Sequence, residues 1–88
     1  MLQLVYTTRF KKDFKRVNKR GLKQQKLQAI IELLMAEKNL PAKYRDHELI
    51  GNYVHHRECH IEPDWLLIYR VVGKELRLER TGSHSDLF

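Results

Sequence analysis

The chain has 88 residues, of which 42% are apolar and 32% charged, and its formal net charge at pH 7 is +6. These proportions are ordinary for one globular domain spanning residues 1–88 and too apolar for a disordered chain. The longest apolar run, Trp65–Tyr69, is far shorter than the ~18–20 residues of a membrane span, and the single cysteine, Cys59, can form neither an internal disulfide nor a Cys-x-x-Cys metal clamp. A membrane protein, a disulfide-stapled secreted domain and a zinc finger are therefore excluded, and we expect a cytoplasmic protein.

The first half of the chain predicts one strand followed by two helices. Residues 2–6 form a short alternating run, as in a strand, and Thr7 or Thr8 is a suitable N-cap for the segment that follows. A first helix is predicted by apolar residues at i, i+4 and i+7: Phe10, Phe14 and Val17. A second helix is predicted by five apolar residues on one face: Leu27, Ile30, Ile31, Leu34 and Met35. Gly21 suits the left-handed position after the first helix, and the second ends before Pro41, so the two form an antiparallel hairpin.

The second half of the chain predicts the sheet that covers this hairpin. Three strands separated by turn residues are expected at Tyr53–Ile61, Trp65–Val72 and Glu75–Arg80. Trp65–Val72 is apolar on both parities, which is typical of a central strand, and Gly73 suits a two-residue hairpin turn. Pro41–Asn52 is expected to be a connector and Thr81–Phe88 a polar tail. The fold class is therefore α+β with the order β-α-α-β-β-β, a helix hairpin packed on a small, mainly antiparallel sheet.

The last strand contains one conflict. Strict alternation places Arg80 on the same face as Leu76 and Leu78, which belongs to the core. A β-bulge, or a core face that opens into a cleft at the end of the strand, would resolve this conflict. The sequence leaves both explanations open.

Basic residues are concentrated in Arg9–Lys26, which contains nine Lys and Arg residues and one acid, Asp13. Residues 1–38 hold ten basic and three acidic residues, whereas residues 39–88 hold seven basic and eight acidic ones. Such a stripe attracts polyanions by counterion release, although a solvated helix face is the alternative. Because no acidic residues are interleaved to form i,i+4 pairs, we expect binding to nucleic acid or to an acidic protein. The candidate substrate-binding residues in this stripe are Lys11, Lys12, Lys15, Arg16 and Lys19.

All five histidines lie in the second half, at positions 47, 55, 56, 60 and 84. A metal site is not expected from them. His56 and His60 would lie about 13 Å apart along a strand, and Cys59 and His60 would point to opposite faces. Neither pair can share one tetrahedral ion, and only a contribution from His84 and a loop residue would complete a zinc site. No metal and no other cofactor is predicted.

Metal-free acid–base chemistry on RNA is the alternative for which the second half of the chain can supply the groups. RNA carries its own nucleophile, the 2′-OH, so a protein must supply a base, an acid, a cation for the phosphorane and surfaces that hold the bases. The candidates are His60 or Asp64 as base, His84 as acid, Arg80 as phosphate clamp, and Trp65 and Phe88 as stacking surfaces. The structural alternative places Trp65 in the core and uses Phe88 to seal a sheet edge.

Three segments resemble the YafQ-like branch of the RelE toxin superfamily: Asp46–Gly51, Arg57–Tyr69 and Leu76–Phe88. The resemblance implies a RelE-like fold and a toxin of a bacterial type II toxin–antitoxin module. It also implies a metal-independent endoribonuclease (an mRNA interferase) that cuts mRNA in the ribosomal A site and so inhibits translation. The residues that match this family are His47, His60, Asp64, Trp65, Arg80, His84 and Phe88.

The resemblance also implies roles and partners. It makes His84 the general acid and Arg80 the group that stabilises the transition-state phosphate, while His60 and Asp64 act as base or orienting group, with the base left open. The implied partners are the 70S ribosome, its mRNA and a cognate antitoxin that covers the basic surface, with operator DNA reached only through the antitoxin complex and no membrane involved. The basic helices would bind ribosomal RNA or antitoxin. Two other functions stay open: a gyrase-inhibiting toxin of the same fold and a non-catalytic nucleic-acid-binding module.

Overall fold

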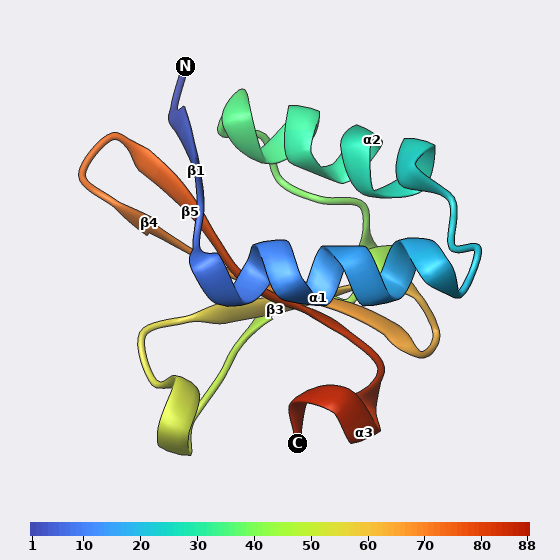
Figure 1. The fold of residues 1–88 in the computed structure, drawn as a ribbon. Coiled ribbons are helices and arrows are strands. Elements are labelled where there is room, and N and C mark those ends of the chain that lie inside the picture. The colour runs from blue at the N-terminus through green and yellow to red at the C-terminus, as the bar shows by residue number, and fades with distance from the viewer.

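The computed structural model describes residues 1–88 (Figure 1), and none of its helices is long and apolar enough to cross a membrane. Short 3₁₀ turns occur at Ala42–Tyr44 and Gly51–Tyr53. In chain order the helices and strands are β1 (Gln3–Tyr6), α1 (Thr8–Lys19), α2 (Gln24–Met35), β2 (His47–Glu48), β3 (Arg57–Glu62), β4 (Trp65–Val72), β5 (Glu75–Gly82) and α3 (His84–Leu87). The predicted β-α-α-β-β-β order is confirmed, and the structure adds the short elements β2 and α3.

The five strands form one mixed sheet with the order β1-β5-β4-β3-β2. β1 runs parallel to β5, and the other three pairs are antiparallel. β4 lies in the middle, and its first five residues, Trp65–Tyr69, are all buried, in agreement with their apolar character on both parities. The predicted two-residue turn between β4 and β5 is also confirmed, because Val72 pairs with Glu75 and Gly73 has a φ of +59°.

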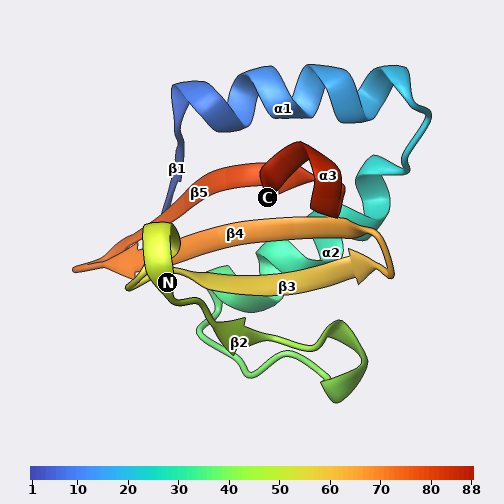
Figure 2. The same cartoon turned by 90° about the horizontal axis from the view of Figure 1, so that it is seen from below.

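α1 and α2 form the predicted antiparallel hairpin (Figure 1). Thr7 caps α1, since its hydroxyl oxygen accepts a hydrogen bond from the Phe10 backbone N–H at 3.1 Å. Gly21 follows the helix with a φ of +79°, a left-handed conformation that glycine adopts without steric cost. Figure 2 shows α2 behind the sheet and α3 in front of it, so the two faces of the sheet carry different elements.

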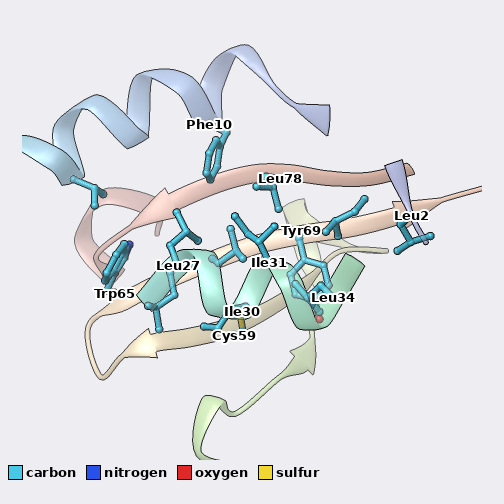
Figure 3. Close-up of a cluster of buried hydrophobic side chains, with 14 residues drawn as sticks. Leu2, Phe10, Leu27, Ile30, Ile31, Leu34, Cys59, Trp65, Tyr69 and Leu78 are labelled. Carbon is cyan, nitrogen blue, oxygen red and sulfur yellow. The ribbon is translucent and has the colours of Figure 1, made fainter. Parts of the chain in front are cut away.

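The main hydrophobic core lies between the helix hairpin and one face of the sheet (Figure 3). It contains 14 buried residues, among them Phe10 of α1, Ile31 of α2 and Leu78 of β5. A second cluster of three buried residues lies on the opposite face: Leu66, Ile68 and Leu87. Because Leu87 belongs to α3, this small cluster fixes the C-terminal helix to the sheet.

A β-bulge in β5 resolves the conflict over Arg80. Leu78 pairs with Tyr69 and Arg80 pairs with Ile68, so the register shifts between these two pairs and Glu79 is the extra residue. Leu78 therefore faces the main core, whereas Arg80 faces the other side of the sheet together with Ile68. Of the two explanations that the sequence left open, the bulge is confirmed.

The strand predicted at 53–61 and the connector predicted at 41–52 are only partly right. β3 begins at Arg57, because the backbone before it turns: Gly51–Tyr53 forms a 3₁₀ turn and His55 has a φ of +68°. The connector contains β2, whose two residues pair with the start of β3. β-propensity alone could not place the start of β3, since Tyr and Val also occur in the preceding turn.

The polar tail predicted after residue 80 is wrong. β5 continues to Gly82, and α3 follows as a single helical turn. A capping box begins this turn: the Asp86 backbone N–H donates to the Ser83 hydroxyl at 3.2 Å, and the Ser83 backbone N–H donates to the Asp86 carboxylate at 2.9 Å. α3 thus brings the C-terminal residues back onto the sheet.

Candidate active site

Polar side chains gather on the face of the sheet that carries α3. Glu58 and Arg80 both pair with Ile68, from β3 and β5 respectively, so these three residues share a face. His60 lies on the same face, two residues after Glu58. α3 adds His84, whose ring centroid is 5.7 Å from that of His60. Residues from β3, β5 and α3, distant in sequence, therefore form one cluster.

Asp64, in the turn between β3 and β4, is bound to His84 by two hydrogen bonds. The backbone N–H and the Nδ1–H of His84 donate to Oδ1 of Asp64 at 2.9 Å and 2.7 Å. These bonds, the backbone one first, hold the pKa of Asp64 below its ordinary value, so the carboxylate is ionised at neutral pH. Because an ionised carboxylate only accepts, Nδ1 of His84 carries a proton and Nε2 is left for other partners.

Glu58 lies between His47 and His60. The carboxylate is 4% exposed, and its Oε1 is 3.5 Å from Nε2 of His47 and 3.4 Å from Nε2 of His60. Nδ1 of each ring lies beside a backbone carbonyl, that of Arg45 at 2.6 Å and that of Pro63 at 3.3 Å. Since a carbonyl oxygen only accepts, Nδ1 carries the proton in both rings and Nε2 faces the carboxylate. Glu58 is not among the residues predicted for the site, although its position two residues before His60 on a strand places both side chains on one face.

The guanidinium of Arg80 is fixed by two neighbours. Nε and Nη2 donate to the two oxygens of Asp13 at 2.6 Å and 3.1 Å, and Nη1 donates to the hydroxyl of Tyr53 at 3.2 Å. The hydrogen bond to Asp13 raises the pKa of Arg80 above its ordinary value, so the group is a cation throughout the physiological pH range. Neither Asp13 nor Tyr53 was predicted to belong to the site.

The two candidate stacking residues occupy different environments. Phe88 is 64% exposed, and its ring makes an edge-to-face contact with Tyr53, with centroids 5.8 Å apart. Trp65 is 1% exposed and lies in the main core, where Nε1 donates to the hydroxyl of Thr81 at 2.9 Å (Figure 3). The prediction that Trp65 offers a stacking surface is wrong, because its ring is on the helix-covered face of β4. Of the two candidate stacking residues, only Phe88 has an exposed ring.

The basic residues of α1 are exposed and are divided between two faces of the helix. Lys11 and Lys15 line a groove of about 780 Å³ between α1 and α2, whereas Lys12 and Arg16 line a smaller hollow beside Arg80. The expectation that the basic stripe lacks acidic partners holds only in part. Three of its nine basic residues form ion pairs within 4.0 Å: Arg16 with Asp13 and Asp86, Arg20 with Asp86, and Lys26 with Glu62. Lys19 and the other lysines of α1 form none.

The remaining histidines and the cysteine lie outside the cluster. His56 places Nδ1 3.1 Å from the carbonyl of Val54 and Nε2 3.7 Å from Glu79, and His55 is exposed on the preceding turn. Cys59 has no exposed surface, and burial raises the pKa of its thiol. No group of three His, Cys, Asp or Glu side chains has the arrangement that a metal ion needs.

Asp86 anchors α3, and with it His84, to the end of α1. Nη1 and Nη2 of Arg20 donate to the two carboxylate oxygens of Asp86 at 2.5 Å and 3.0 Å. These bonds are the largest of the effects that hold the pKa of Asp86 well below its ordinary value. Because α3 has only four residues, its polar attachments are this bidentate pair, the capping box and the two hydrogen bonds from His84 to Asp64.

This anchor predicts an acid-dependent loss of stability. A carboxyl group whose pKa is lower in the folded state stabilises the fold above its unfolded pKa of about 4, and the stabilisation is lost as the pH falls below that value. We expect Asp86→Asn to lower the free energy of unfolding at pH 7 and the difference from wild type to shrink below pH 4. Urea unfolding followed by circular dichroism between pH 7 and pH 3 measures this difference. A difference that stays constant over this range contradicts the prediction.

Comparison with known proteins places this chain in a family. The model for the bacterial toxin of type II toxin-antitoxin systems, YafQ, matches residues 2–88. The mRNA interferase toxin YafQ of Escherichia coli K12 is 44% identical over 84 residues, which is 94% of this chain and 91% of the relative. The putative toxin YafQ of Haemophilus influenzae is 34% identical over 92 residues, which is 97% of this chain and 90% of the relative.

Solved structures agree. A copper-bound mutant toxin from Helicobacter pylori superposes with a TM-score of 0.96 at 41% identity and full coverage of both chains. The toxin in the crystal structure of the E. coli DinJ–YafQ complex superposes with a TM-score of 0.91 at 42% identity, over 100% of this chain and 99% of that one. The chain therefore belongs to the YafQ family of bacterial type II toxin–antitoxin toxins.

Proposed function

We propose that this protein is a metal-independent endoribonuclease that cleaves messenger RNA in the ribosomal A site. The observation that carries the proposal is the hydrogen-bonded pair of Asp64 and His84. The ring centroid of His84 lies 5.7 Å from that of His60, and both histidines lie on the sheet face that carries Arg80. The E. coli relatives are named mRNA interferase toxins, which supports the same class of reaction. Translation is inhibited because the message is cut while it is being read.

The reaction needs only groups of this cluster and the RNA itself. The 2′-oxygen bonds to the adjacent phosphorus while the bond from phosphorus to the 5′-oxygen breaks, giving a 2′,3′-cyclic phosphate and a 5′-hydroxyl. His84 is the general acid, because Asp64 holds its Nδ1 and leaves Nε2 to protonate the leaving 5′-oxygen. His60 is the base that takes the 2′-OH proton at Nε2, because its Nδ1 already carries a proton beside the Pro63 carbonyl and the carboxylate of Glu58 stabilises the imidazolium that forms. DNA lacks the 2′-OH and is not cut.

The other residues of the cluster orient these groups. Arg80 stabilises the negative charge of the phosphorane, and Phe88 stacks on a base so that attack is in line. His47 shares the carboxylate of Glu58 with His60 and fixes its orientation. A metal ion is dispensable here because a histidine activates the nucleophile and a guanidinium neutralises the phosphate.

The partners follow from the same proposal. The E. coli family member is found in complex with DinJ, so we assign this protein a small antitoxin that covers its basic surface. The 70S ribosome is the other partner, and the compartment is then the cytoplasm. The exposed lysines of α1 attract ribosomal RNA or an acidic antitoxin segment by the same electrostatics. Operator DNA is contacted only through the antitoxin complex.

Expression of wild type and His84→Ala in bacteria tests the activity. Wild type is expected to arrest growth and to leave codon-phased 5′ ends in an abundant message, detected by primer extension. His84→Ala is expected to do neither, because loss of a general acid typically costs about 10²–10⁴ in rate. The exposed His55, which lies outside the cluster, supplies the control: His55→Asn keeps a residue that tolerates its positive φ and should behave as wild type.

Purified toxin on programmed ribosomes tests the metal independence. The toxin is first treated with EDTA and freed of the chelator, because the ribosome itself needs Mg²⁺ in the assay. The treated toxin is expected to cleave at the rate of untreated toxin, and a loss of activity that an added transition metal restores contradicts that part of the proposal. Equal growth arrest by wild type and His84→Ala with an intact message contradicts catalysis, and a ribosome-free gyrase assay then examines the rival toxin activity. Full activity of His84→Ala combined with its loss in Lys12→Ala/Lys19→Ala indicates a non-catalytic nucleic-acid-binding module.

A further inference from the structure

Asp13, the one acid among the basic residues of Arg9–Lys26, is buried beside Arg80 of the candidate active site. Asp13 is 3% exposed and lies on the apolar stripe of α1, between Phe10 and Val17. A carboxylate at such a position is costly unless its oxygens are fully hydrogen-bonded. Its presence among nine basic residues therefore calls for a specific set of partners.

Those partners include two guanidinium groups. Oδ2 of Asp13 accepts from Nε of Arg80 at 2.6 Å and from the backbone N–H of Thr81 at 3.2 Å. Oδ1 accepts from Nη2 of Arg80 at 3.1 Å and from Nη2 of Arg16 at 2.6 Å. One carboxylate oxygen thus joins an arginine of the helix to an arginine of β5, and the two cations are held side by side.

The manner of this contact leaves donors free. A guanidinium has five N–H groups in a rigid planar fork. Asp13 occupies the edge formed by Nε and Nη2 of Arg80, and Tyr53 takes one N–H of Nη1. One N–H of Nη1 and one of Nη2 remain as donors for phosphate oxygens. Asp13 therefore fixes the orientation of Arg80 and still leaves two of its five N–H donors free.

A hollow of about 480 Å³ opens beside these two arginines. It is lined by Arg9, Lys12, Asp13, Arg16 and Arg80, with no apolar residue. Four cations surround one buried carboxylate, so the net charge of the lining is strongly positive. Such a hollow suits an anion, and a phosphate group is the anion that arginine pairs recognise best.

We propose that Asp13 is a positioning residue that presents Arg80 and Arg16 together, so that the hollow holds the RNA backbone on both sides of the cleaved bond. Arg80 binds the scissile phosphate, and Arg16, with Arg9 and Lys12, binds the adjacent one. This inference rests on the proposed ribonuclease function, which it deepens by naming the subsite of the neighbouring phosphate. α1 becomes part of the active site through a residue that never touches the substrate.

Asp13→Asn distinguishes positioning from simple electrostatics because the two effects have opposite signs. Removal of a negative charge makes the surface more basic, so electrostatics alone predicts tighter anion binding. Positioning predicts weaker binding of inorganic phosphate and a single-turnover cleavage rate on programmed ribosomes lower by roughly 10–100-fold, the range typical of lost orienting partners at metal sites. Glu32→Gln is the charge-matched control, because it removes one exposed acid of α2 outside the hollow. Val17→Ala controls for lost stability of α1.

NMR of the arginine side chains tests the positioning of Arg80 independently of the cleavage rate. In wild type, the Nε–H signal of Arg80 in ¹⁵N-resolved NMR should exchange slowly with solvent, and the Arg80 and Arg16 signals should shift together as inorganic phosphate is added. In Asp13→Asn the exchange should accelerate and the common shift should be lost. Combining Asp13→Asn with Arg80→Ala completes a double-mutant cycle. In the Arg80→Ala protein, Asp13→Asn should not lower the cleavage rate further, because its effect acts through Arg80.

Three results overturn the inference. The first is an Asp13→Asn protein that binds phosphate as tightly as wild type or more tightly and cleaves at the wild-type rate. The second is a full further loss of rate in the Arg80→Ala background. If Asp13→Asn does not fold, Arg16→Gln replaces it as the test variant, since the Arg16 side chain is 43% exposed and its replacement leaves the core intact. Unchanged phosphate binding in Arg16→Gln is the third result that overturns the inference. Should wild type cleave no RNA, the proposed function fails, and the phosphate titration still decides the role of Asp13.

Discussion

Replacement of Arg80 with alanine is expected to lower the rate of RNA cleavage by about 10²–10³-fold, the usual effect of deleting a preorganised donor to transition-state charge. Asp13 and Tyr53 already fix the guanidinium, so it need not reorganise when negative charge develops on the phosphorane. The measurement is single-turnover cleavage of a message on programmed ribosomes at saturating toxin. Under these conditions the rate reports the chemical step, and a change in binding does not contribute.

The same substitution has a structural cost that can be separated from the catalytic one. Arg80→Ala removes two of the hydrogen bonds to the buried carboxylate of Asp13, which keeps only Arg16 and the backbone N–H of Thr81. A buried charge left short of partners is destabilising. We therefore expect the double variant Arg80→Ala/Asp13→Asn to recover part of the lost unfolding free energy and none of the lost rate. A folded Arg80→Ala protein that cleaves as fast as wild type contradicts the role given to Arg80.

The elements predicted correctly are those with a local periodic signal. The stripe of Phe10, Phe14 and Val17 repeats with the period of a helix, and the alternation in β5 repeats with the period of a strand. The turns at Gly21 and Gly73 need a positive φ, and glycine at these positions indicates such turns in the sequence. Local periodicity and turn chemistry were therefore sufficient for the helix hairpin, for β4 and for most of β5, whereas they did not place the start of β3.

The features that were missed depend on contacts between distant segments. The parallel pairing of β1 with β5 arises from how the strands meet, and no local pattern encodes it. The bulge at Glu79 was one of two explanations that the alternation around Arg80 left open, and only the pairing of β4 with β5 decides between them. α3 did have a local signal, the capping box formed by Ser83 and Asp86, but a single helical turn shows no hydrophobic period. Its stability comes from Arg20 and the sheet.

The candidate site was predictable where a residue type has few structural uses. His60, Asp64 and His84 were chosen for their chemistry, and the structure brings them together. Trp65 was misplaced because β4 is apolar on both parities, so the sequence could not show which of its faces the helices cover. Asp13 was not predicted to belong to the site, because only its charge within the basic segment was considered. An acidic residue on the apolar stripe of a helix indicates that its side chain is buried against a partner.

Gly82→Ala is expected to lower the cleavage rate by about 100-fold, because small misplacements of a catalytic group have effects of that size. Gly82 has a φ of +154°, and a Cβ added there would lie 2.8 Å from Oδ2 and 3.0 Å from Cβ of Asp86. Asp86 cannot move away freely, since Arg20 and the Ser83 backbone N–H both hold its carboxylate. α3 must shift as a unit, and His84 then leaves its partner in the turn between β3 and β4.

Gly73, in the β4–β5 turn, provides a control that identifies the cause of the lower cleavage rate in Gly82→Ala. Gly73 also has a positive φ, of +59°, but no atom lies within 4 Å of an added Cβ. Gly73→Ala therefore incurs a backbone cost of about 1–2 kcal/mol and leaves the cleavage rate unchanged. In Gly82→Ala the rate should fall even under conditions where the protein is fully folded by circular dichroism, and the Nδ1–H signal of His84 should lose the shift that its bond to Asp64 produces. A folded Gly82→Ala protein with the wild-type rate and an unchanged His84 signal would show that the position of α3 does not control the general acid.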